Sequence, residues 1–192
     1  MINYFNTRLA NNKFYFLLST ILLSFVVLLN FSNKLSICSF IYVVIALIAN
    51  IMTEFYGQKK TMYAIAVSAS ISAALLWNTD YYINNVKFDI MLFGSFLSVI
   101  ISTYLGTSLS LRLKSVYNFQ VRNLTSLVLC SIADCSVMAC VLASKFSISK
   151  VSFIFSKDIV FKFSYSLVLS LCLILAFYLI KQVQKVKNNF NI

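Results

Sequence analysis

Residues 124–143 read LTSLVLCSIADCSVMACVLA, an apolar stretch long enough to cross a lipid bilayer as a helix. A transmembrane helix needs about 20 mostly apolar residues. One carboxylate, Asp134, lies in the middle of this stretch, where a charged side chain costs about 2.5–3.5 kcal/mol on insertion scales. Such an acid usually faces a polar cavity on a substrate or ion path, but it can also pair with a basic residue and join two helices. Asp134 is therefore the first candidate functional residue, with both interpretations open.

The composition extends the membrane prediction to the whole chain. Of 192 residues, 60% are apolar and 11% are charged, and the mean hydropathy is +0.87, which is far above that of a soluble domain. Backbone groups in lipid need partners within their own segment, which favours helices. We therefore expect an all-α polytopic membrane protein, a single domain over residues 1–192 with six transmembrane helices. The expected helices are 14–31, 36–52, 62–77, 88–109, 124–143 and 159–180.

The basic residues predict the orientation of these helices. Ten of them, including Lys59, Lys60, Arg112 and Lys114, fall on one side of the six-helix arrangement, and five fall on the other. Basic residues are enriched in cytoplasmic loops, so both termini are expected in the cytoplasm. The net charge of +11 then matches anionic lipid headgroups. We expect no nucleic-acid partner, because no basic cluster lies on a soluble domain that could follow phosphates.

Several classes of chemistry have no residues to support them. The chain has no histidine, its five cysteines lack the CxxC spacing of a metal or redox site, and no GxxxxGK[ST] phosphate loop occurs. We therefore expect no metal, no cofactor and no enzymatic activity. The longest predicted connection, Ser144–Asp158, mixes polar and aromatic residues and is expected to be a loop.

A second informative stretch, residues 49–60, closes the second predicted helix. Asn50, Thr53, Glu54 and Gly57 are spaced i, i+3, i+4 and i+7 and so share one helical face. In one interpretation Glu54 pairs with Lys59 or Lys60 and Gly57 caps the helix. In the other interpretation this face lines the cytoplasmic half of a binding cavity. The spacing alone does not separate the two.

Three motifs resemble the queuosine-precursor transporter family, also called the vitamin uptake transporter family. The first is Ala49-Asn50-Ile51-Met52-Thr53-Glu54-Phe55-Tyr56-Gly57-Gln58. The second is Arg122, Ser126, Ser131 and Asp134 in the fifth helix, and the third is Phe161-Lys162 at the start of the last. The chain departs from the family at position 50, where Asn replaces Asp. It also departs at residues 107–110, where Thr-Ser-Leu-Ser replaces Gln-x-x-Asp, and in lacking the Thr-Pro of the last helix.

The resemblance implies a bacterial inner-membrane importer of a queuosine precursor for transfer-RNA modification. The small-molecule substrate would be a 7-deazaguanine base such as queuine, preQ0 or preQ1. Its ring edge carries an N–H and an amino group side by side, which one carboxylate can accept as two hydrogen bonds. Phe55, Tyr56 and Trp77 are candidates for stacking on the ring. The candidate substrate-binding residues are Asp134, Glu54, Asn50, Lys162, Ser126 and Thr53.

Two alternatives stay open at this stage. Lys162 either pairs with Asp134 inside the bundle or extends to the outer headgroups. The chain either transports by itself or is the substrate-binding subunit of a vitamin importer that needs a separate energising ATPase complex. Membrane lipid is the expected environment in both cases, and a homodimer is left open.

Overall fold

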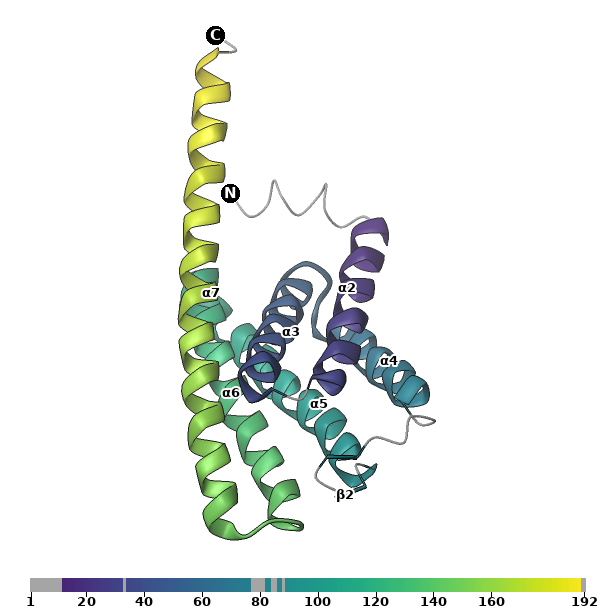
Figure 1. Ribbon diagram of the computed structural model, residues 1–192. Helices are drawn as coiled ribbons and strands as arrows, with labels where there is room; N and C mark the ends of the chain where they lie inside the picture. The colour runs from purple at the N-terminus through teal and green to yellow at the C-terminus, as the bar shows by residue number, and fades with distance from the viewer. Residues whose placement is uncertain (1–11, 33, 77–81, 84–85, 88, 191–192) are drawn as a thin grey trace.

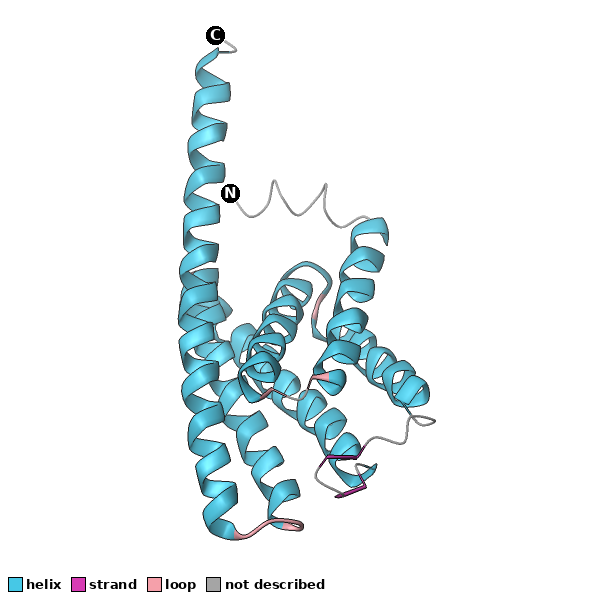
Figure 2. Cartoon of the chain, in the orientation of Figure 1, coloured by secondary structure: helices cyan, strands magenta, loops and turns pink. Residues whose placement is uncertain are grey.

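The computed structural model describes residues 12–32, 34–76, 82–83, 86–87 and 89–190, and almost all of them are helical (Figures 1 and 2). A two-residue antiparallel pairing joins β1 (Tyr82–Ile83) to β2 (Val86–Lys87), and a short 3-10 helix, η1 (Leu113–Ser115), follows α5. The long helices are α2 (Asn12–Phe31), α3 (Leu35–Tyr56), α4 (Gln58–Leu76), α5 (Asp89–Arg112), α6 (Phe119–Ala143) and α7 (Ile148–Phe190). The prediction of an all-helical fold is confirmed.

Five helical segments of the described ranges are long and apolar enough to cross a membrane. By the length and composition of its helices, the chain is thus a multi-pass membrane protein. The helix α4 is long enough, with 19 residues, but it is less apolar than the five and is not among them, so a sixth crossing stays a prediction. The side of the membrane on which the termini lie also stays a prediction. The five segments are Asn12–Phe31, Leu35–Tyr56, Leu92–Ser115, Phe119–Ala143 and Ile148–Ala176.

The expected loop at Ser144–Asp158 is wrong, because α7 already begins at Ile148. The polar residues of the segment favour a loop on composition, but its polar and apolar residues alike lie on a continuous helix. Lys157 stacks over the Phe153 ring one turn earlier, with Nζ 4.3 Å from the ring centroid, while Val151 and Asp158 are buried. The helix α7 has 43 residues, about 65 Å at 1.5 Å per residue, and extends beyond the bundle (Figure 1).

The helix α3 lies at the centre of the bundle and packs against α2, α4, α5, α6 and α7. Its apolar residues recur on almost every side, so it buries residues around most of its circumference, as a helix surrounded by protein does. Leu22 and Val26 of α2 complete the core on one flank. The core residues of α3 are Ile41, Tyr42, Val43, Ile45, Ala46, Ile48, Ala49 and Met52.

Small residues allow close helix contacts on two sides. Ser68, Ala69 and Ser72 of α4 are buried. The helices α5 and α6 lie close together at Gly106, where an added Cβ would lie 2.0 Å from Cys130 Sγ. Close approach at glycine is a standard solution in membrane helices.

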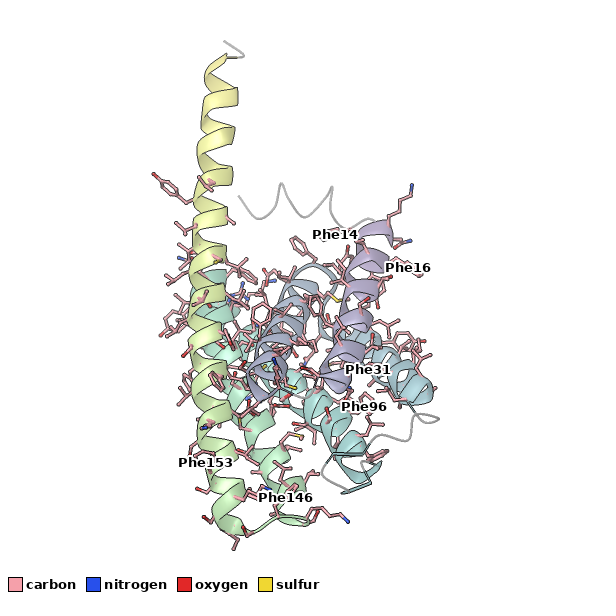
Figure 3. All side chains as sticks on the ribbon, in the orientation of Figure 1. Phe14, Phe16, Phe31, Phe96, Phe146 and Phe153 are labelled. Carbon is pink, nitrogen blue, oxygen red and sulfur yellow. The ribbon has the colours of Figure 1, made fainter. Side chains whose placement is uncertain are left out.

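The bundle has two distinct ends, which we name after residues that lie there. The Ser32 end holds the α2–α3 connection and the turn between α6 and α7, where Phe146 and Phe153 lie in Figure 3. The Gly57 end holds the junction of α3 with α4. Gly57 has a φ of 81° and donates its N–H to Thr53 O at 3.1 Å. Glycine adopts this φ without strain, so the predicted helix cap at Gly57 is confirmed.

Candidate functional site

Lys162 of α7 is held between two carboxylates inside the bundle. Its Nζ lies 2.5 Å from Asp134 Oδ2 on α6 and 2.5 Å from Asp158 Oδ2, one turn earlier on α7. All three residues are buried, with exposed fractions of 3%, 5% and 8% respectively. Lys162 therefore pairs with Asp134 inside the bundle and does not extend to the outer headgroups. We call Asp134, Asp158 and Lys162 the acid–lysine cluster.

Neighbouring side chains satisfy the remaining carboxylate oxygens of the cluster. Ser98 of α5 donates to Asp134 Oδ1 at 2.6 Å, and Ser39 of α3 donates to Asp158 Oδ1 at 2.6 Å. The Tyr42 ring lies beside the ammonium group, with its centroid 4.7 Å from Nζ, which adds a cation–π attraction. Four helices thus hold the cluster in place. Buried ion pairs keep their charges only when such hydrogen bonds complete them.

The acid–lysine cluster borders a cavity of about 200 Å³ at the Ser32 end of the bundle. All three cluster residues contribute to its lining, together with polar and apolar groups from α2, α3, α5 and α6. Ligand pockets for drug-sized molecules measure about 300–1,000 Å³, so this one suits a smaller ligand. Other polar residues of the lining are Asn30, Ser32, Cys38, Ser39, Tyr42 and Ser95.

A second polar group lies at the Gly57 end. Arg122 of α6 donates from Nη2 to Glu54 Oε2 at 3.1 Å and from Nη1 to Ser110 O at 3.2 Å. Lys114 of η1 approaches Glu54 Oε1 at 3.4 Å. Arg122 is 2% exposed, so this pair is largely removed from solvent. Of the two interpretations of this stretch, the one that paired Glu54 with Lys59 or Lys60 named the wrong partner, because the packing of α6 on α3 places the buried Arg122 against Glu54.

Asn50 joins α3 to α6 one turn from Glu54. Its Nδ2 donates to Asn123 Oδ1 at 2.9 Å, and its Oδ1 accepts from Ser126 Oγ at 2.9 Å. Asn50, Asn123 and Ser126 are all buried. Together with the Glu54–Arg122 pair they form two polar layers between α3 and α6, which we call the Gly57-end contacts.

The six candidate residues therefore fall into two groups. Asp134 and Lys162 line the cavity, whereas the other four lie among or beside the Gly57-end contacts. Arg122 and Asp134 are twelve residues apart on α6, a separation of about 18 Å along the helix axis. The four residues of the second group are Asn50, Thr53, Glu54 and Ser126. Their part in substrate binding stays a prediction.

The acid Asp158 is the residue that sequence reasoning missed. It was placed at the end of a loop, although its position four residues before Lys162 was visible in the sequence and is the spacing of a helical ion pair. Ser39, Ser98 and Asn123 were missed too, because single polar residues in apolar stretches carry no local signal of their partners.

Phe55 and Tyr56, two of the three aromatic candidates, are not part of the cavity lining. Phe55 packs edge-on against Phe14, with 6.3 Å between ring centroids, and Tyr56 packs against Tyr15 at 5.1 Å. Both contacts join α3 to α2. Trp77 lies outside the described residues.

Four buried uncharged polar side chains of α3, α6 and α7 each carry an atom with no hydrogen-bond partner. Ser166 and Ser170 follow Lys162 by one and two turns on α7, and the Thr53 hydroxyl and Asn123 Nδ2 lie among or beside the Gly57-end contacts. A buried polar atom left unsatisfied costs about 1–3 kcal/mol. Ser166 and Ser170 extend the buried polar face of α7 beyond the acid–lysine cluster.

Within the described ranges, no group of three or more histidine, cysteine, aspartate or glutamate side chains is arranged to hold a metal ion. Comparisons of the chain with family models, with curated proteins and with solved structures found no match.

Proposed function

We propose that this protein is an importer of a queuosine precursor, a 7-deazaguanine base, across the bacterial inner membrane for transfer-RNA modification. The observation that carries the proposal is the placement of Asp134, a carboxylate within a spanning helix, on the wall of an internal cavity beside Lys162. Buried charges in a membrane bundle are expensive, and those that border a cavity mark substrate or ion paths. The motif resemblance supplies the substrate class.

The donor pattern of the ligand fits the acceptor at the cavity wall. Asp134 accepts from Ser98 and from Lys162, so both of its oxygens already serve as hydrogen-bond acceptors. The N–H and amino group of a 7-deazaguanine edge would replace such donors with a fork of two hydrogen bonds. A cavity of about 200 Å³ has the volume of about seven waters at about 30 Å³ each, so it admits a small ligand only.

The position of the cavity supports alternating exposure of the binding site. The cavity lies at the Ser32 end, and the Gly57 end is closed by the Glu54–Arg122 pair and by the hydrogen bonds of Asn50. If the Gly57 end faces the cytoplasm, as its basic residues predict, this arrangement corresponds to a site reached from outside. Release into the cytoplasm then requires the Gly57-end contacts to open.

Complementation tests the proposal directly. The chain is expressed in a bacterium that lacks both precursor synthesis and its own importer, each precursor is supplied at low concentration, and queuosine in transfer RNA is measured. We expect queuosine to return with the wild type and with Ser136→Ala, an exposed position on α6, but not with Asp134→Asn. Absence of queuosine for every precursor, despite membrane expression and the required downstream enzymes, would contradict the proposal. Restoration only with added ATPase subunits would favour the binding-subunit alternative.

A further inference from the structure

The acid–lysine cluster holds one more acid than base. Asp134 and Asp158 carry two formal negative charges, and Lys162 carries one positive charge. No further acidic or basic side chain lines the cavity among the described residues. The excess negative charge lies on buried side chains, where an unbalanced charge costs several kcal/mol. A ligand with one positive charge would balance it.

The geometry of the cluster is already that of an ammonium site. Lys162 Nζ contacts one oxygen of each acid and lies over the Tyr42 ring, which is the environment that a primary ammonium group prefers. Because both Oδ2 atoms are 2.5 Å from the same nitrogen, they are at most about 5 Å apart. One small ligand can therefore contact both acids at once.

We propose that the ligand carries an amine, and that its ammonium group takes the place of Lys162 as the hydrogen-bond donor to Asp158. The ring edge of the ligand then binds Asp134, as in the proposed function, on which the identity of the ring rests. The amine itself rests only on the charge and geometry of the cluster. The favoured substrate class is an aminomethyl-bearing 7-deazaguanine. A nitrile-bearing base lacks the charge, and the cavity volume disfavours an amine that carries a further ring.

Binding to the purified full-length protein in lipid nanodiscs tests this assignment. The three probes are the aminomethyl base preQ1, the nitrile base preQ0, and benzylamine, which has the amine without the base. We expect preQ1 to bind at least tenfold more tightly than preQ0. Asp158→Asn makes the cluster formally neutral and should remove that preference, because the ammonium group then has no second acid to accept it.

A conservative variant separates charge from structural damage. Asp158→Glu keeps a carboxylate at this position, so the net charge of the cluster stays −1. We expect this variant to keep most of the preference for preQ1 over preQ0 that Asp158→Asn loses. A purely structural role of Asp158 predicts the same ratio of preQ1 to preQ0 binding in both variants. The comparison of preQ1 with preQ0 on the wild type needs no variant, so the test stays decisive if Asp158→Asn does not fold.

The outcomes distinguish this inference from the proposed function. Equal binding of preQ1 and preQ0 by the wild type, or a preference unaffected by Asp158→Asn, overturns the inference and leaves base import standing. Binding of benzylamine as tightly as preQ1 supports the amine site and contradicts base recognition. No binding of either amine overturns the inference, and preQ0 binding in that case still supports the proposed function.

Discussion

Asp134 on α6 and Lys162 on α7 form a buried ion pair, and Asp158 completes it from the same helix as the lysine. The pair joins the two helices on either side of the turn at the Ser32 end. Together with Asp158, it places three charged side chains at one cavity wall. Because buried charges depend on one another, loss of a single partner has consequences for both stability and binding.

Removing Lys162 should destabilise the protein more than removing either acid. Lys162→Met leaves two carboxylates close together without a counter-charge, whereas Asp134→Asn leaves a balanced pair of Lys162 and Asp158. Removal of one partner from a buried pair typically costs about 3–5 kcal/mol. Thermal unfolding in detergent, followed by size-exclusion chromatography, checks the order. Lys157→Met is the matched control, because Lys157 is exposed on the same helix and its loss should leave the transition unchanged.

The contact between α5 and α6 at Gly106 should be intolerant of a methyl group. In Gly106→Ala the new Cβ would lie 2.0 Å from Cys130 Sγ and 3.0 Å from Ser126 Oγ. Overpacking of this kind costs about 1–3 kcal/mol or more. Adding Cys130→Ala should recover part of the loss, since it removes the nearest atom. Equal unfolding temperatures of the single and double variants would argue against a steric cause.

Glu54 should hold the Gly57 end closed. Glu54→Gln removes the charge that pairs with the buried Arg122 guanidinium, so the contact between α3 and α6 should open more often. In a background without native cysteines, we expect Thr53→Cys to react slowly with a membrane-impermeant maleimide applied from the Gly57 side, and at least severalfold faster with Glu54→Gln. Lys59→Gln is the control, because it changes an exposed charge on the second residue of α4. A similar acceleration by Lys59→Gln would indicate a general surface effect.

The unpartnered hydroxyls of α7 should be reached by water during the transport cycle. Ser166 and Ser170 face the bundle interior without a hydrogen-bond partner, and polar groups of this kind are normally satisfied by water or ligand. In the cysteine-free background, Ser166→Cys and Ser170→Cys should react with a water-soluble methanethiosulfonate. Val168→Cys, on the exposed side of the same helix, should not react within the membrane. Unreactive cysteines at both interior positions would show that this part of the bundle stays dry.

The helical fold and one ion pair could be predicted from sequence because their signals are local. Apolar stretches of spanning length locate the helices, and a lone acid and a lone lysine in neighbouring spans predict each other. The helix over residues 148–158 was missed because its serines, lysines and aspartate lower the mean hydropathy of the segment. In the structure Lys150 and Lys157 lie over the rings of Phe146 and Phe153. With that helix, Asp158 was missed as well.

The separation of the candidate residues into two groups depends on packing that no local pattern encodes. Glu54 and Arg122 are 68 positions apart in the chain, and their contact requires α6 to lie against α3 at a particular depth. Lys59 and Lys60 were nearer in sequence, but they lie beyond the helix end on exposed positions of α4. Sequence spacing identifies which residues share a helix face, and it does not identify the helix that covers that face.

The most direct test of the central claim is uptake of radiolabelled preQ1 into proteoliposomes that contain the purified full-length protein. We predict saturable uptake by the wild type, unchanged uptake by Ser136→Ala, and uptake reduced at least tenfold in Asp134→Asn. Size-exclusion chromatography and a cooperative thermal transition check that the Asp134→Asn protein is folded. Uptake by Asp134→Asn at the wild-type rate, or no uptake above empty liposomes by any folded variant, would contradict a transport role for the cavity beside Asp134.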